Sequence, residues 1–158
     1  MEPENGSKAA ECQFDDSNLT SAFRLVVESR LELVGETVER VLQSVSKIPG
    51  INGNLEEVGL ALDEALTNAI IHGNRKDPKK KVEICGGCDH DRNLVLAVTD
   101  EGGGFDLTAI PDPTSGDNIF SSRGRGVYLI HQLMDRTEYR KGGRQVVLKK
   151  RLPLEGSA

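Results

Sequence analysis

Hydrophobic positions recur with two different periods along the chain, and each change of period marks a new element. Phe23, Leu25 and Val27 alternate with polar neighbours, which predicts a strand over residues 20–28. Apolar residues then recur at helical spacing over residues 32–45, which predicts a helix, and Pro-Gly and Asn-Gly pairs end that segment. The pattern therefore starts with a strand that is followed by an amphipathic helix.

A second amphipathic helix is predicted to begin after Asn54 and to run to about His72. Asn54 is a favourable N-cap, and Glu57, three residues later, completes the capping-box pattern. Gly73 is placed to end the helix. One face of the helix needs a sheet or another helix to cover it, because it carries Val58, Ala61, Leu62, Ala65, Leu66, Ala69 and Ile70.

The next segments are two strands and a long irregular stretch. Strands are predicted over residues 81–86 and 93–100, with a turn around residues 86–89 between them. A nearly continuous apolar run makes the second of these a central strand. Residues 102–126 follow no period, and a loop of about 20 residues inside a compact domain is usually functional.

The chain ends with a predicted helix over residues 127–134 and a hairpin with strands over 137–140 and 144–151. Strands that come in pairs, and do not alternate with helices, favour an α+β fold. We expect a two-layer sandwich in which a mixed, mostly antiparallel sheet carries helices on one face. A doubly wound nucleotide-binding fold needs more βαβ units than this chain offers.

Length and charge narrow the classes of function. The 158 residues fit one domain, predicted over residues 18–153, with a poorly ordered polar tail at 1–17 and a short tail at 154–158. A net charge of −5 gives no electrostatic support for direct nucleic-acid binding. The short basic run Lys79-Lys80-Lys81 is typical of a solvated loop or strand edge.

The expected location is the cytoplasm, with no membrane contact. No apolar run approaches the ~20 residues that a membrane span needs. Residues 1–7 are acidic and polar, unlike a secretory signal. In that compartment reduced thiols are the default for Cys12, Cys85 and Cys88. The spacing of Cys85 and Cys88 would suit a zinc site, but no second ligand pair accompanies them, so zinc is the weaker reading.

Polar residues on the second predicted helix are the first candidate for chemistry. Glu64, Asn68 and His72 are spaced four apart and therefore share one helix face. Asn68 can supply an oxygen to Mg²⁺, which binds few protein ligands and keeps several waters. Glu64, one turn away, could orient or deprotonate an attacking hydroxyl group. The alternative is a solvated, capped helix face.

Two glycine-rich segments are the second candidate. Asp100 precedes Gly102, Gly103 and Gly104 at the end of the central strand, where its carboxylate can accept hydrogen bonds from a purine amine and glycines let the backbone approach a flat ligand. The alternative is a tight turn with a capping aspartate. Residues 121–126 lead into the next helix with two arginines and two glycines, a possible phosphate site at a helix N-terminus. The alternative there is an exposed basic helix cap.

In this order, the three segments resemble the ATP-binding domain of the GHKL superfamily, the Bergerat fold. Glu64-xxx-Asn68 is similar to the N box, Asp100-x-Gly102-x-Gly104 to the G1 box, and Gly124-x-Gly126 to the G2 box. The resemblance covers about residues 23–152. Within the superfamily, residues 67–74 and 122–126 are similar to those of the bacterial anti-sigma factor serine/threonine-protein kinases.

The resemblance implies a role for each matching residue. Glu64 would be the general base and Asn68 the Mg²⁺ ligand, with Asp100 reading the adenine of ATP. Gly102 and Gly104 would shape the adenine pocket. Phosphates would be contacted from the lid, the loop that covers the nucleotide, by Arg123, Gly124, Arg125 and Gly126. The same likeness puts further cofactor-binding residues at Thr67, His72, Gly73 and Val127. A position that often holds threonine in this family is Arg144 or Gln145 here.

The resemblance also implies partners. The expected function is an ATP- and Mg²⁺-dependent serine protein kinase that phosphorylates a STAS-domain antagonist and sequesters a sigma factor. Two alternatives stay open: a switch kinase of a STAS protein that binds no sigma factor, and a non-catalytic ATP-binding regulatory module. The catalytic domain of a split sensor histidine kinase is disfavoured, because the lid over residues 106–122 is short and has no phenylalanine-rich box like that of the sensor histidine kinases. The family also suggests a homodimer through the first strand and helix.

Overall fold

The structure is a computed structural model, and it describes residues 12–103 and 129–153. Its strands are β1 (Thr20–Glu28), β2 (Lys81–Cys88), β3 (Asn93–Thr99), β4 (Arg136–Arg140) and β5 (Gln145–Arg151). Its α-helices are α1 (Val34–Val45) and α2 (Leu55–Asn68), and α2 continues into a π-helix over Ala69–Gly73. Short 3₁₀ turns occupy Leu31–Leu33, Asn52–Asn54 and Lys141–Gly143, and residues 129–133 are helical.

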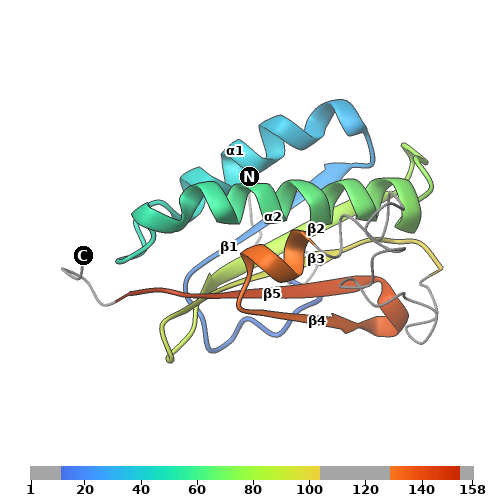
Figure 1. The fold of residues 1–158 in the computed structure, drawn as a ribbon. Helices are drawn as coiled ribbons and strands as arrows, with labels where there is room; N and C mark the ends of the chain where they lie inside the picture. The colour runs from blue at the N-terminus through green and yellow to red at the C-terminus, as the bar shows by residue number, and fades with distance from the viewer. Residues whose placement is uncertain (1–11, 104–128, 154–158) are drawn as a thin grey trace, which may run out of the picture.

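The five strands form one sheet in the order β1-β2-β3-β5-β4. Every neighbouring pair is antiparallel. Helices α1 and α2 lie together over one face of this sheet (Figure 1). The predicted α+β sandwich with helices on one face is therefore confirmed, and the described sheet is antiparallel throughout, where we expected a mixed one.

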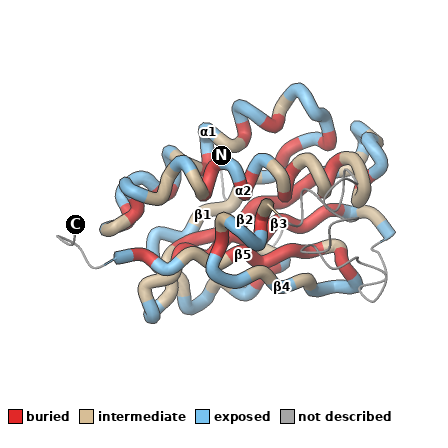
Figure 2. The backbone as a smooth tube through the Cα atoms, viewed as in Figure 1, coloured by how far each residue is buried: buried red, intermediate tan, exposed pale blue. Residues whose placement is uncertain are grey.

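The core lies between the sheet and the helices. Along β3, Leu94, Leu96 and Val98 pack with the helical layer, whereas Val95 and Ala97 belong to a second, smaller cluster on the opposite face. Because successive strand residues point to opposite faces, a strand that is apolar throughout must be covered on both sides. The central strands are accordingly buried along their length (Figure 2).

The N-terminal segment covers the sheet face opposite to α1 and α2, called the helix-free face because the described residues place no helix on it. Phe14 is buried against Val95, Ala97 and Val147, and Leu19 packs beside them. The first eleven residues of the predicted tail lie outside the described residues, but residues 12–17 are packed on the sheet. Within the described ranges, no helix is long and apolar enough to cross a membrane.

The predicted capping box at the start of α2 is wrong. Asn54 makes no side-chain cap and instead donates from Nδ2 to the carbonyl of Gly50, 3.3 Å away. Glu57 forms an ion pair with Lys150, with 3.4 Å between Oε1 and Nζ. The reason is the 3₁₀ turn that precedes α2, because it holds Asn54 at φ −115° and ψ −1°, outside the extended conformation that a capping residue adopts.

The turn predicted around residues 86–89 is also misplaced. Strand β2 continues to Cys88, and the chain reverses over residues 89–92, where Asp89 accepts hydrogen bonds from the backbone of Asp91 and Asn93. Gly86 serves close packing inside the sheet, since a Cβ there would lie 2.6 Å from the carbonyl oxygen of Val95. A glycine pair in a strand can thus be mistaken for a turn.

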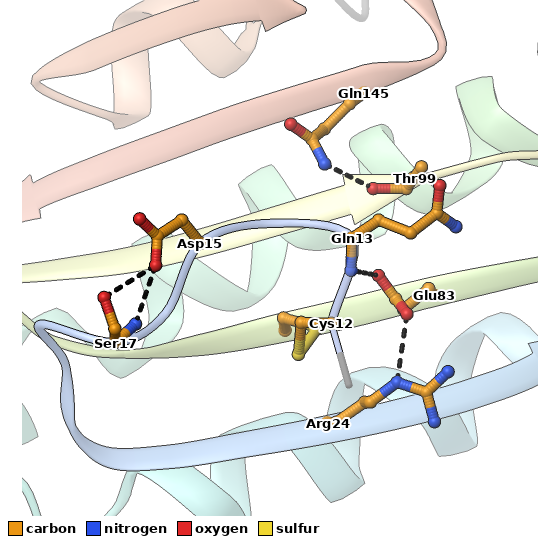
Figure 3. Close-up of a disulfide and its surroundings, with 9 residues drawn as sticks. Cys12, Gln13, Asp15, Ser17, Arg24, Glu83, Thr99 and Gln145 are labelled. Carbon is orange, nitrogen blue, oxygen red and sulfur yellow. Dashed lines mark hydrogen bonds and ion pairs between the residues drawn. A yellow bond between two sulfur atoms is a disulfide. The ribbon is translucent and has the colours of Figure 1, made fainter. Parts of the chain in front are cut away.

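Two of the three cysteines are joined. Cys12 and Cys85 form a disulfide (Figure 3). Cys88 is a free thiol. The expectation of three reduced thiols is therefore wrong in this structure. Cys85 and Cys88 also cannot form a shared zinc site, because they lie three positions apart on one strand and so face opposite sides of the sheet.

Candidate functional site

Helix α2 positions the first candidate residues by its periodicity. Its apolar residues Val58, Leu62 and Leu66 are buried against the core. Glu64, Thr67 and Asn68 are half-buried, while their neighbour Asp63 is exposed. Glu64 and Asn68 stand one α-helical turn apart, so their side chains share a face as predicted. This face is neither core nor fully solvated surface.

The helix changes character directly after Asn68. Over Ala69–Gly73 it is a π-helix, and the amide of Asn74 donates to the carbonyl of Ala69, five residues back, at 2.8 Å. π-Turns of this kind recur at functional sites. The half-buried His72 lies within this π-turn, four residues after Asn68.

The π-turn brings Gly73 into contact with Asp100, the residue that follows β3. A Cβ on Gly73 would overlap the carboxyl group of Asp100 and would lie 2.8 Å from its Oδ1 atom. A Cβ on Gly102 would in turn overlap the carbonyl oxygen of Gly73. Gly73, Asp100 and Gly102 thus form one close-packed cluster, and glycine is required at two of its positions. Gly73 ends the helix as predicted, but it does so without the left-handed conformation of a usual glycine stop.

Asp100 is fixed by its backbone and its side chain. It is only 6% exposed. The amide of Gly102 donates to its Oδ1 at 2.8 Å, and its own amide donates to the carbonyl of Arg144 at 2.8 Å. A buried carboxylate with a fixed orientation can present its remaining acceptor capacity to a ligand amine.

Asn74 locks this cluster in place, and sequence reasoning assigned it no role. The residue is 1% exposed. Its Nδ2 atom donates to Ser29 Oγ at 2.5 Å and to the carbonyl of Lys81 at 3.0 Å, while its Oδ1 accepts from the amide of Glu101 at 2.8 Å. One side chain therefore bonds the end of the helix to β2 and to the segments that follow β1 and β3. The Gly-Asn pair after an apolar helix was the available signal, because a buried amide needs such partners.

Arg144 and Gln145, the two residues considered for the position that often holds threonine in this family, have different surroundings. Gln145 is 2% exposed and donates from Nε2 to Thr99 Oγ1 at 2.8 Å. Thr99 and Asp100 are successive residues, so this bond lies on the face opposite to Asp100. Arg144 is the residue whose backbone contacts Asp100.

Several predicted site residues lie outside the described residues: Gly104, Arg123, Gly124, Arg125, Gly126 and Val127. The structure brings together Gly73, Asp100 and Gly102, and it aligns Glu64 with Asn68 on the helix that ends at this cluster. Over residues 12–103 and 129–153, no group of three or more His, Cys, Asp or Glu side chains could hold a metal ion.

A two-layer α+β fold with an acidic residue and glycines packed at the end of a polar-faced helix defines a class, and comparison with known proteins identifies it. Residues 27–150 match the histidine kinase-like ATPase domain family. The chain belongs to this family. The predicted GHKL resemblance is thereby confirmed.

Individual relatives narrow the position within the family. The chain is 30% identical over 125 residues to the serine-protein kinase RsbW of Bacillus subtilis, covering 75% of this chain and 77% of that protein. It is 35% identical over 106 residues to the anti-sigma F factor of Clostridium acetobutylicum, covering 63% of this chain and 72% of that protein. The predicted enzyme class, an ATP-dependent serine/threonine protein kinase, is confirmed at the level of these relatives.

A solved structure supports the fold alone. The RsbU and RsbW domains of Rv1364c from Mycobacterium tuberculosis superpose with a TM-score of 0.60 at 17% identity. The match covers 88% of this chain and 35% of that one.

Proposed function

We propose that this chain uses ATP and Mg²⁺ to phosphorylate a serine on a STAS-domain antagonist, and that it also sequesters a sigma factor. The observation that carries the proposal is the buried Asp100 carboxylate, packed between Gly73 and Gly102 at the end of α2. A purine amine is a natural donor to such a carboxylate, and the two glycines hold the carboxylate in one orientation. Family membership supports ATP as the ligand.

The residues present fit this cofactor pair. Glycine at positions 73 and 102 lets the chain pack directly against Asp100 and so fixes its carboxylate, since any side chain at either position would overlap it or its neighbour. On α2, the amide oxygen of Asn68 is a hard ligand of the kind that Mg²⁺ prefers, and one or two protein ligands suffice because phosphates and water complete the shell. Bound Mg²⁺ would neutralise phosphate charge during transfer.

The proposed general base and metal ligand both lie on α2. Glu64 would accept the proton of the serine hydroxyl, and Asn68 would hold the metal one turn further along. Thr67 and His72 would line the nucleotide site beside them. In the lid, Arg123, Gly124, Arg125, Gly126 and Val127 would contact phosphates, and Gly104 would complete the adenine pocket.

The partners and the setting are part of the same proposal. The names of the relatives support a kinase of the RsbW type and an anti-sigma factor. We place the protein in the cytoplasm as a homodimer that pairs through β1 and α1, with residues 18–153 as the kinase domain. A pull-down with sigma factor separates this proposal from a switch kinase, which would phosphorylate the antagonist but leave the sigma factor unbound.

The test of the chemistry is transfer of phosphate to a STAS-domain protein by the Glu64→Ala variant. General bases contribute about 10²- to 10⁴-fold, so transfer should fall by that factor while ATP binding persists. Asp63→Ala is the matched control, because it removes an exposed carboxylate one residue away on the same helix. Wild-type transfer by Glu64→Ala would refute the assigned base.

Isothermal titration with ATP tests the metal site. Binding by the wild type should depend on Mg²⁺, and Asn68→Ala should lose that dependence. Tight binding of ATP by the wild type without transfer to any STAS-domain protein would favour the non-catalytic regulatory module instead.

A further inference from the structure

A short N-terminal segment is bonded covalently across the face of the sheet that carries no helix. The disulfide joins Cys12 to Cys85 on β2, 73 residues away in sequence. From Cys12 the chain crosses the sheet towards the start of β1 (Figure 3). Neither the kinase chemistry nor the nucleotide cluster uses this bond.

The other attachments of the segment to the sheet are few. The amide of Gln13 donates to Glu83 Oε1 at 2.9 Å, the Phe14 ring is buried, and the guanidinium of Arg140 stands 5.6 Å from the centre of that ring. In the part of the chain that the structure describes, the remaining hydrogen bonds of residues 12–17 stay within residues 12–19. The disulfide is therefore the covalent attachment of a segment whose other described contacts with the sheet are the Gln13–Glu83 hydrogen bond and the packing of Phe14.

What lies under the segment is unlike an ordinary solvated sheet face. Val95, Ala97 and Val147 are each 1% exposed beneath it. Beside them runs a buried polar row of Glu83, Thr99 and Gln145, in which Glu83 also pairs with Arg24 at 3.0 Å. Release of the segment would uncover both the apolar strip and one side of the polar row.

We propose that Cys12 and Cys85 are a redox modification site: the disulfide latches residues 12–19 over the helix-free face, and reduction by a dithiol frees the segment and uncovers that face. The inference does not depend on the kinase activity. Disulfides in reducing compartments are typically transient and redox-sensing.

The geometry fixes the direction of the exchange. Cys85 is fully buried, whereas Cys12 is half-buried and borders a surface hollow of about 560 Å³ that is also lined by Phe14 and Arg24. A thiolate of the dithiol attacks Cys12 Sγ, the bond to Cys85 breaks, and Cys85 leaves as a thiolate that takes up a proton. The second thiol of the reductant then displaces Cys12, so two electrons pass to the protein and the dithiol becomes a disulfide.

Cys88 supplies an internal control. It is a free thiol at the end of β2, on the face opposite to Cys85, and it packs partly against the main core. Burial raises the pKa of the Cys88 thiol, and the neighbouring Asp89 charge raises it further. A thiol with a raised pKa competes poorly in exchange. In Cys88→Ser the only possible intramolecular disulfide is the one between Cys12 and Cys85.

The test is hydrogen exchange of the full chain, oxidised and then reduced with dithiothreitol. In the wild type and in Cys88→Ser, non-reducing peptide mapping should recover the pair of peptides that contain Cys12 and Cys85. Reduction should speed exchange of the amides of residues 13–19 by about thirtyfold or more, as expected for loss of a disulfide, while α1 and α2 stay protected. Cys12→Ser should resemble the reduced protein without any treatment.

Two results would overturn the inference. One is the absence of the crosslinked peptides from air-oxidised Cys88→Ser. The other is unchanged exchange of residues 13–19 after complete reduction of the wild type. Because the second result uses the natural chain, it is decisive even if Cys12→Ser fails to fold.

Discussion

Replacing Gly73 by alanine is the most direct test of the close packing around Asp100. The added Cβ would overlap the carboxyl group and stand 2.8 Å from Oδ1. The carboxylate has little freedom to retreat, because the Gly102 amide holds it and Gly102 itself is in contact with the carbonyl of Gly73. Gly73→Ala should therefore shift the π-turn away from the end of β3.

The size of the effect follows from the kind of contact. Overpacking of a well-packed site costs about 1–3 kcal/mol, and each kcal/mol lowers the melting temperature of a chain of this length by about 2–4 °C. A hydrogen bond to a charged group is worth about 1.5–3 kcal/mol, so losing the one proposed between adenine and Asp100 should weaken ATP binding by about 10- to 150-fold. Calorimetry measures the affinity, and a thermal melt measures the stability.

Two other glycines separate the effects on stability and on binding. In Gly86→Ala the new Cβ would lie 2.6 Å from the Val95 carbonyl, inside the sheet and away from Asp100, so stability should fall while ATP affinity stays within about twofold. In Gly35→Ala, at an exposed site of α1 with no atom within 4 Å, stability should rise by up to about 1 kcal/mol. Wild-type affinity in Gly73→Ala, or equal loss of affinity in Gly86→Ala, would refute the assignment of the site.

Two further predictions concern buried and half-buried polar groups. Asn74→Ala should lower the free energy of unfolding by about 2–5 kcal/mol in urea denaturation, because it removes the partner of the buried Ser29 hydroxyl and of the Glu101 amide. An effect below about 0.5 kcal/mol would contradict this role of Asn74. Burial raises the pKa of Asp89, but hydrogen bonds from Asn93 and Asp91 outweigh it and hold that pKa below its ordinary value of 3.8. A lowered folded-state pKa stabilises the protein above the unfolded-state pKa and loses that contribution as pH falls through the folded-state value, so below about pH 4 the melting temperature should drop more steeply in the wild type than in Asp89→Asn. Parallel slopes would contradict it.

Periodicity predicted most of the fold because burial imposes it. The alternation in residues 20–28 and the helical spacing up to Val45 match β1 and α1, since each element is covered on one side by the same core. The Gly86-Gly87 pair was misread because composition does not distinguish a turn from close packing within a sheet. The partner of Cys12 could not be predicted from the sequence, because it depends on where residues 12–17 cross the sheet.

Only part of the candidate site could be predicted from the sequence. The shared face of Glu64 and Asn68 could be predicted because both residues lie within regular α-helix. The contact between Gly73 and Asp100 could not be predicted, because it requires the π-turn, and no hydrophobic pattern in the sequence indicates a π-turn. What the sequence does contain is the pair of neighbours that makes the turn possible: Gly73 permits the contact, and Asn74 bonds the turn to β2 and to the segments that follow β1 and β3.

Gly73 and Asn74 together position the end of the helix beside Asp100. Without a small residue at position 73 the helix could not approach the carboxylate, and without the buried amide at position 74 nothing in this network would keep the helix end in register with β1 and β2. Glu101 is also bonded to the start of β2, because Lys81 donates its amide to Glu101 Oε1 at 2.6 Å. A shift of the helix end would therefore strain β2 and the segment after β3 together. The spatial relation between α2, which carries the proposed base and metal ligand, and Asp100, which carries the proposed adenine contact, is in this way set by residues that need touch neither phosphate nor metal.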